Sequence, residues 1–169
     1  MLLLTPLRGE AVKACPATNP PYLCCRYTVI NSMNQCPMEC SYCVLQSYLE
    51  TPLITLFTGR EQLSAQINSF QCQQPRRFFR FGTGELADSL ALEDVTGCGR
   101  DLSSYFSGRN NSLLELKTKS ASVESMLEAP HENTVLSWSL NPQQLISREE
   151  HLAASLSRRL EAAHTAQEK

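Results

Sequence analysis

Short runs rich in β-branched and aromatic residues alternate along the chain with runs whose apolar residues recur at helical spacing. The first kind predicts strands and the second predicts helices. The predicted strands cover 26–32, 52–58, 76–85, 112–120 and 133–142, and the predicted helices cover 43–49, 60–70, 88–106, a short helix through Leu127, and 147–164. Since strands joined through helices can pair in parallel, the pattern favours βα units in a parallel sheet or barrel.

The two ends of the chain refine this fold class. Four of the nine prolines and a Cys-Cys pair fall within residues 1–25, which predicts an irregular leader before a single domain over 26–169. The helix predicted over 147–164 opens with a Ser-x-x-Glu capping box and has leucines at 152, 156 and 160 on one face, yet no strand follows it. A full eight-unit barrel needs roughly 250 residues, so we expect an incomplete TIM-like barrel that lacks its last strands.

Composition excludes some classes of function. The 15 basic and 17 acidic residues give a net charge of −2, so the overall balance indicates no polyanion partner, although a local basic groove is compatible with it. Since no apolar run approaches the roughly 20 residues of a membrane span, we expect a cytoplasmic protein. In that reducing compartment the eight cysteines are expected to bind metal, act in catalysis or lie buried.

Three of these cysteines, Cys36, Cys40 and Cys43, form a C-x₃-C-x₂-C pattern between a predicted strand and a predicted helix. A structural zinc site needs four ligands, and the nearest further thiols, Cys24 and Cys25, lie at the other end of the preceding strand. A [4Fe-4S] cluster held by three thiolates would instead leave one iron open to another ligand. Both metal sites remain possible from the spacing alone.

The cysteine spacing, with Tyr42 between the last two thiols, resembles the radical S-adenosylmethionine (SAM) superfamily. Four segments in the same order, CSYCVLQSYL, GTGELADSLALE, LLELKTKS and SWSLNP, resemble the spore photoproduct lyase family of DNA-repair enzymes over roughly residues 15–163. The resemblance implies a partial (βα)₆ TIM-like radical SAM barrel with a [4Fe-4S] cluster on the three cysteines and SAM on the fourth iron. It also implies a lyase that cleaves SAM reductively to a 5′-deoxyadenosyl radical and repairs a thymine-dimer photoproduct in DNA. DNA and an electron donor such as flavodoxin or ferredoxin would be its partners.

The resemblance assigns SAM contacts to two of these segments. Tyr42 would contact SAM, although an aromatic packed in the core is the ordinary alternative. The Gly-rich turn at Gly82, Thr83, Gly84 and Glu85 would receive the methionyl ammonium, with Glu85 supplying negative charge. Most such turns bind no ligand, and here the position after a strand favours binding.

The two remaining segments supply polar side chains at strand ends. Lys119 matches a family lysine that contacts SAM, although Lys117 lies on the same face of the strand by period-two alternation. Ser139 matches a family serine near the ribose, and Ser137 and Asn141 share its face. A serine bonded only to backbone near a strand end is the alternative for Ser139 and Ser137.

One departure from the family bears on the substrate. The family's hydrogen-donating cysteine falls near residues 85–87, where this chain has Glu-Leu-Ala, and the next thiol, Cys98, is the candidate donor. Alternative functions are therefore a radical SAM relative with another substrate, or a non-catalytic iron–sulfur or zinc module.

Several other residues have simpler interpretations. Cys72 and the three thiols Cys15, Cys24 and Cys25 are expected to pack, with a second metal as the alternative for the three. Glu149 and Glu150 are explained by helix-start electrostatics. The run 76–81 is expected to hold core phenylalanines and solvated arginines, with a basic-aromatic nucleic-acid surface as the alternative.

Overall fold

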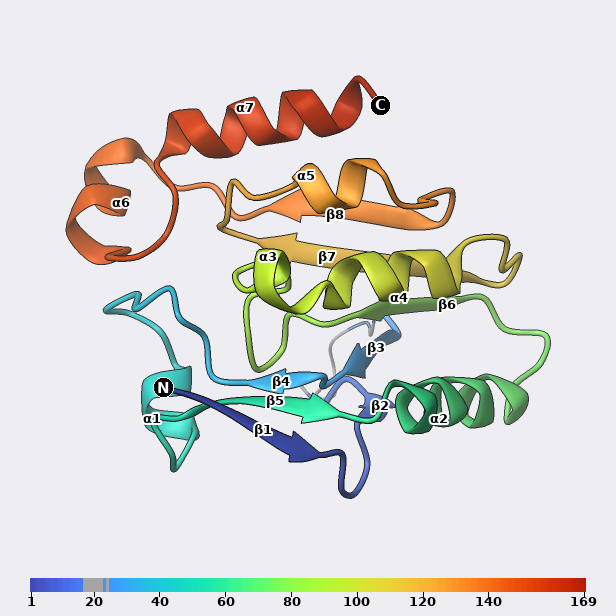
Figure 1. Cartoon of the computed structure of the whole chain (residues 1–169). Coiled ribbons are helices and arrows are strands. Elements are labelled where there is room, and N and C mark those ends of the chain that lie inside the picture. Colours follow the sequence, from blue (N-terminus) through green and yellow to red (C-terminus); the bar gives the residue numbers. More distant parts are fainter. Residues whose placement is uncertain (17–22, 24) are drawn as a thin grey trace.

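The structure is a computed structural model that describes residues 1–16, 23 and 25–169. Its main sheet has five strands in the order β2-β3-β6-β7-β8 (Figure 1). Strands β3 (Tyr27–Ile30), β6 (Phe79–Gly82), β7 (Ser112–Thr118) and β8 (Thr134–Trp138) run parallel, while β2 (Val12–Ala14) pairs antiparallel with β3. The predicted α/β class with parallel βα units is confirmed.

A second, three-stranded sheet has the order β1-β5-β4. It consists of β1 (Leu2–Pro6), β5 (Ile54–Thr58) and β4 (Met33–Asn34), with β1 parallel and β4 antiparallel to β5. The strand predicted over 52–58 is therefore present but lies outside the parallel sheet. In the described residues the main sheet has four parallel strands, so the six-unit barrel is not confirmed.

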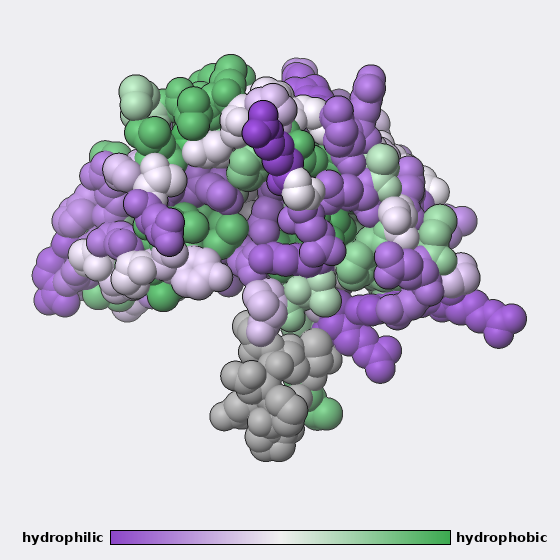
Figure 2. All heavy atoms as spheres, turned by 90° about the horizontal axis from the view of Figure 1, so that it is seen from below, coloured by the Kyte–Doolittle hydropathy of each residue, from purple (hydrophilic) through white to green (hydrophobic). Residues whose placement is uncertain are grey.

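The prediction of an irregular leader over residues 1–25 is wrong where β1 and β2 form. The residues of β1 and β2 do not indicate which strand each one pairs with. Strand β1 pairs with β5, about fifty residues later, and β2 pairs with β3 at an edge of the main sheet. The leucines of β1 remain 40–61% exposed, which leaves hydrophobic atoms on the face of the molecule seen in Figure 2. Cys24 and residues 17–22 lie outside the described residues.

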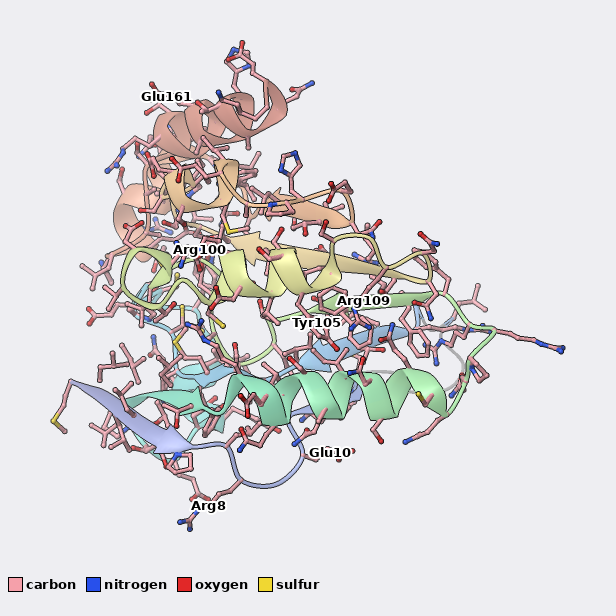
Figure 3. All side chains as sticks on the ribbon, turned by 45° about the vertical axis from the view of Figure 1, so that its right-hand side comes forward. Arg8, Glu10, Arg100, Tyr105, Arg109 and Glu161 are labelled. Carbon is pink, nitrogen blue, oxygen red and sulfur yellow. The ribbon has the colours of Figure 1, made fainter. Side chains whose placement is uncertain are left out.

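The three longest helices pack on one face of the main sheet (Figure 1). The helices are α1 (Leu45–Tyr48), α2 (Arg60–Cys72), α3 (Glu93–Thr96), α4 (Cys98–Phe106), α5 (Glu124–Leu127), α6 (Gln143–Glu149) and α7 (Leu156–Gln167). Figure 3 shows Tyr105 and Arg109 between α4 and α2. The Tyr105 hydroxyl donates a hydrogen bond to the Asn68 side chain of α2 at 2.8 Å. The helix predicted over 88–106 is thus two helices, interrupted at Gly97, whose φ of 57° favours glycine.

The core lies between this sheet face and the helices. Phe79 and Phe81 of β6 are fully buried and stacked, and Phe81 also contacts Phe106 of α4. Leu114 and Leu116 of β7 extend the same cluster. Burying each such side chain contributes about 1.5–3 kcal/mol. The expectation of core phenylalanines in the run 76–81 is confirmed for these two and wrong for Phe78, which is 62% exposed because it precedes the strand.

The helix predicted over 147–164 is divided by a turn. Helix α6 ends at Glu149 and α7 begins at Leu156, with Ser155 as its N-cap. The expected leucine stripe does not face the core, since Leu152 is 61% and Leu160 is 49% exposed. A bridge between the backbones of Glu150 and Cys40 takes residue 150 out of the helix, so Leu152 lies in the turn. In the described part of the chain no helix is long and apolar enough to cross a membrane.

Candidate functional site

The candidate site lies where the parallel strands of the main sheet end. Since the carboxyl ends of parallel strands share one edge of a sheet, the segments that follow β3, β6, β7 and β8 meet there. These segments contain the cysteine loop, the Gly-rich turn, Lys119 and Ser139. The topology therefore gathers all the segments that the sequence singled out for cofactor binding.

The cysteine loop, residues 36–43, surrounds a hollow of about 840 Å³ that Cys36, Cys40 and Cys43 all line. Cys40 is buried and the other two are partly buried. Burial raises the pKa of Cys36 to about 11. Within the described residues no group of three or more Cys, His, Asp or Glu side chains is arranged to hold a metal. The three thiols are donors of the right type around one hollow, but they do not converge.

The backbone of the cysteine loop is held by the turn between α6 and α7. The amide of Ser41 donates to the carbonyl of Glu149 at 2.8 Å, and the amide of Leu152 donates to the carbonyl of Met38 at 3.1 Å. Together with the bridge between Cys40 and residue 150, these bonds join two segments that lie over 100 residues apart in the sequence. The loop is thus shaped by a distant part of the chain.

Lys119 is the lysine of β7's end that faces this loop. Its Nζ lies 3.5 Å from the Sγ of Cys40 and 2.9 Å from the hydroxyl of Tyr42, whereas Lys117 is exposed. Burial lowers the pKa of Lys119, but the hydrogen bond with Tyr42 and the charges of Cys40 and Glu150 raise it above its ordinary value. A permanent positive charge therefore sits beside Cys40.

Tyr42 is 51% exposed, so it is not the core aromatic that was the alternative. The Lys119 ammonium lies 4.9 Å from the centre of its ring, and the Asn141 amide lies 3.2 Å from its hydroxyl. That hydroxyl also donates to the carboxylate of Glu150. The hydroxyl of Tyr42 is therefore held by hydrogen bonds, while its ring remains accessible.

Glu150 and Arg159 form a buried ion pair that contacts Tyr42 and Lys119, and no sequence pattern predicts this pair. Both side chains are fully buried. Burial would raise the pKa of Glu150, but hydrogen bonds from Tyr42, Arg159 and Asn141 lower it to about 2. The interpretation of Glu149 and Glu150 as helix-start residues is wrong for both, because α6 ends at Glu149. The Glu150 carboxylate binds the groups named above, and the Glu149 carboxylate accepts a hydrogen bond from the Ser41 hydroxyl.

The Gly-rich turn follows β6, as predicted. A Cβ on Gly82 would lie 1.6 Å from the hydroxyl of Tyr27, whereas a Cβ on Gly84 would be 3.6 Å from its nearest neighbours. Gly82 is therefore required by packing, and Gly84 is not. Thr83 donates to the Ser89 hydroxyl at 2.7 Å.

Glu85, at the end of the turn, is bound by two side chains, one from the residue after β3 and one from β2. Asn31 donates to its carboxylate at 3.1 Å, and the Nζ of Lys13 lies 3.5 Å away. Lys13 belongs to β2, within the segment predicted to be irregular. The carboxylate is thus partly neutralised from the β2 side.

Asp88 is a further residue that sequence reasoning missed. It is buried and accepts from the Thr118 hydroxyl at 2.6 Å and the Lys119 amide at 2.6 Å. Burial raises the pKa of Asp88 above its ordinary value, against these hydrogen bonds. Asp88 therefore fixes the backbone at Lys119. An acidic residue just after the Gly-rich turn was the only sequence signal for it.

Ser139 lies at the expected edge, with its backbone bonded on both sides. Its amide donates to the Thr118 carbonyl at 2.9 Å, and its carbonyl accepts from Arg159 at 2.8 Å. Ser137 donates to the Glu115 carboxylate at 3.2 Å.

Cys98 does not join the cysteine loop. It begins α4 and lines a different hollow of about 450 Å³ together with Asn31, Ser32 and Thr96. Burial raises the pKa of this thiol. Cys72 is exposed, so the expectation that it packs is wrong, because it is the last residue of α2. Cys25 is exposed as well, and Cys15 is partly buried.

Comparison with known proteins gives one consistent match. A family model described as spore photoproduct lyase matches residues 24–169. A spore photoproduct lyase from Clostridium acetobutylicum is 23% identical over 131 residues, which is 76% of this chain and 39% of that protein. The chain therefore spans less than half the length of this relative.

Solved structures match the fold closely. A spore photoproduct lyase complexed with dinucleoside spore photoproduct has a TM-score of 0.88 at 21% identity, covering 99% of this chain and 48% of that one. A spore photoproduct lyase mutant with bound AdoMet and dinucleoside spore photoproduct has a TM-score of 0.87 at 22% identity, covering 98% and 47%. The fold is thus that of about half of each solved chain.

Proposed function

Since the chain belongs to the spore photoproduct lyase family, whose model matches residues 24–169, we propose that it forms the SAM-binding part of a radical SAM lyase. The proposed reaction is reductive cleavage of SAM followed by repair of a thymine-dimer photoproduct in DNA. The observation that carries the proposal is the meeting of Lys119, Tyr42 and Cys40 at the carboxyl edge of the parallel sheet. A reduced flavodoxin or ferredoxin would supply the electron.

Cys36, Cys40 and Cys43 would hold a [4Fe-4S] cluster. Three thiolates from one loop suit such a cluster, and all three line the same hollow, although the loop has to draw its thiols together. When bound, the reduced cluster would supply one electron to the sulfonium of SAM, whose carbon–sulfur bond would break to give methionine and a 5′-deoxyadenosyl radical. The hard chemistry belongs to the cofactor, and the protein binds and orients it.

Other residues of the site would bind the ends of SAM. The Lys119 ammonium suits the methionyl carboxylate, and Glu85 suits the methionyl ammonium. Gly84 has no side chain, so a ligand can come closer to its backbone than it could at another residue. The accessible ring of Tyr42 and the strand-end Ser139 would contact the adenosine.

The substrate is assigned through the relatives. Two solved relatives bind dinucleoside spore photoproduct, and we propose a photoproduct in DNA for this chain. One observation favours a second candidate, a radical SAM relative with another substrate. Residues 85–87 are Glu-Leu-Ala, and Cys98, the next thiol, lines a separate hollow. A hydrogen donor other than Cys98, or another substrate, fits that arrangement.

The test begins with anaerobic reconstitution of the full chain with iron and sulfide. We expect about four iron atoms per chain in the wild type, loss of iron in Cys40→Ala, and full iron in Cys72→Ala, whose thiol is exposed and far along α2. The reduced protein is then incubated with SAM and ultraviolet-irradiated DNA that contains the spore photoproduct. Conversion of the photoproduct back to two adjacent thymidines, measured after enzymatic digestion of the DNA, supports the photoproduct reaction, and a cluster without this conversion supports the second candidate. Zinc in place of iron would contradict both.

A further inference from the structure

The buried pair of Glu150 and Arg159 has no part in the proposed binding of SAM. Arg159 is fully buried and binds two segments, the turn between α6 and α7 and the end of β8. Its Nε donates to the Ala154 carbonyl at 2.8 Å, one terminal nitrogen donates to the Ser139 carbonyl at 2.8 Å, and the other binds Glu150. A guanidinium presents its donors in a fixed fork, so this arrangement sets the position of the Glu150 carboxylate.

The other oxygen of that carboxylate faces the candidate site. It accepts from Asn141 at 2.7 Å and from the Tyr42 hydroxyl, and lies 3.6 Å from the Nζ of Lys119. Two cations therefore share one carboxylate. Without it, Lys119 would keep only Tyr42 and Cys40 as side-chain partners among the described residues.

The backbone of the same segment pairs with the cysteine loop. Residue 150 bridges Cys40, and the residues on either side bind Ser41 and Met38. The carboxylate and the backbone of this turn thus act on the same loop. Removal of one charge of a buried ion pair leaves the other charge uncompensated. A single substitution at Glu150 should therefore disturb both the carboxylate contacts and the backbone contacts of this turn.

We propose that Glu150, held by Arg159, is a positioning residue that braces the cysteine loop and aims Lys119 and Tyr42 at the ligand before any cofactor binds. Its significance for SAM rests on the proposed function, whereas the brace itself is a property of the chain alone. Glu150 touches neither a proposed cluster ligand's sulfur nor SAM, and acts through the side chains it orients.

The first experiment uses the metal-free full chain, so it does not depend on the proposed function. Alkylation of Cys40 and hydrogen exchange of residues 38–43 are followed by mass spectrometry, with the exposed Cys72 as internal reference. Glu150→Gln is expected to raise both rates about tenfold or more, because a buried charged hydrogen-bond network is lost. The matched control is Glu161→Gln, which lies on the outside of α7 (Figure 3) and should change neither rate.

The second experiment measures SAM affinity and the change that SAM causes in the electron paramagnetic resonance spectrum of the reduced cluster. Glu150→Gln is expected to keep its iron but weaken SAM binding about tenfold, through misplaced Lys119. The double change Glu150→Gln with Arg159→Met neutralises the pair and should restore thermal stability without restoring SAM affinity. A purely structural role would restore both.

Each outcome decides one of the two claims. Wild-type rates for Cys40 and residues 38–43 in Glu150→Gln would overturn the brace, whatever the protein binds. If Glu150→Gln does not fold, Asn141→Ala removes one donor to the same oxygen and should give a smaller rise in the same rates, and no rise overturns the brace. Faster rates in Glu150→Gln, together with a wild-type protein that takes up no iron, would support the brace and contradict the proposed function.

Discussion

Replacement of Gly82 by alanine tests the packing beneath the Gly-rich turn. The new Cβ would lie 1.6 Å from the hydroxyl of Tyr27 and 2.4 Å from its ring carbon Cζ. A tyrosine ring is rigid, so it must swing away by more than ~1 Å instead of flexing at its tip. Arg80 lies 5.3 Å from the centre of that ring and would lose the contact.

These displacements set the expected cost. Overpacking of this kind costs about 1–3 kcal/mol. For a chain of this length that lowers the melting temperature by about 2–12 °C. The measurement is urea unfolding and a thermal melt of the full chain, followed by circular dichroism.

Gly84→Ala is the matched control in the same turn. Its Cβ would sit at 3.6 Å from Lys117 and Ser89, an ordinary contact, so stability should change by less than about 0.5 kcal/mol. In a Tyr27→Ala background most of the penalty of Gly82→Ala should disappear, as a double-mutant cycle would show. Equal stability of the two single glycine variants would refute the reasoning.

Three further variants test other parts of the structure. Cys98→Ser should keep its full iron content, since this thiol lines another hollow, and loss of iron would contradict that placement. Asp88→Asn should lower the free energy of unfolding by about 1–3 kcal/mol in a urea titration, because the amide cannot serve both Thr118 and Lys119 as the carboxylate does. Phe81→Ala should cost about 3–5 kcal/mol in the same assay, and a cost below 1 kcal/mol would show that the core is not centred there.

The local features of the site could be predicted from the sequence because they depend on neighbouring residues. Strand β7 was recognisable from alternating apolar residues, and its end placed Lys119 at the edge of the sheet. The cysteine spacing located a loop whose three thiols line one hollow. The choice between Lys117 and Lys119 needed the structure, because both follow the same alternation.

The features that failed depend on contacts across the chain. The sequence of residues 2–6 does not indicate that they pair with 54–58, because the partner strand lies about fifty residues further along the chain. Glu150 follows a good helix pattern, yet its backbone bonds to the cysteine loop and its carboxylate to Arg159. A buried arginine in an amphipathic helix has the same sequence signature as an exposed one.

We propose that the cysteine loop, Lys119 and the Gly-rich turn hold a cluster and SAM in the arrangement in which SAM is cleaved by reduction. The most direct measurement is chromatographic detection of 5′-deoxyadenosine after the anaerobically reconstituted full chain is reduced with SAM present. We expect 5′-deoxyadenosine and methionine in equal amounts from the wild type and none from Cys40→Ala. A wild-type protein that carries its full iron–sulfur content, binds SAM and still yields no 5′-deoxyadenosine on reduction would contradict it.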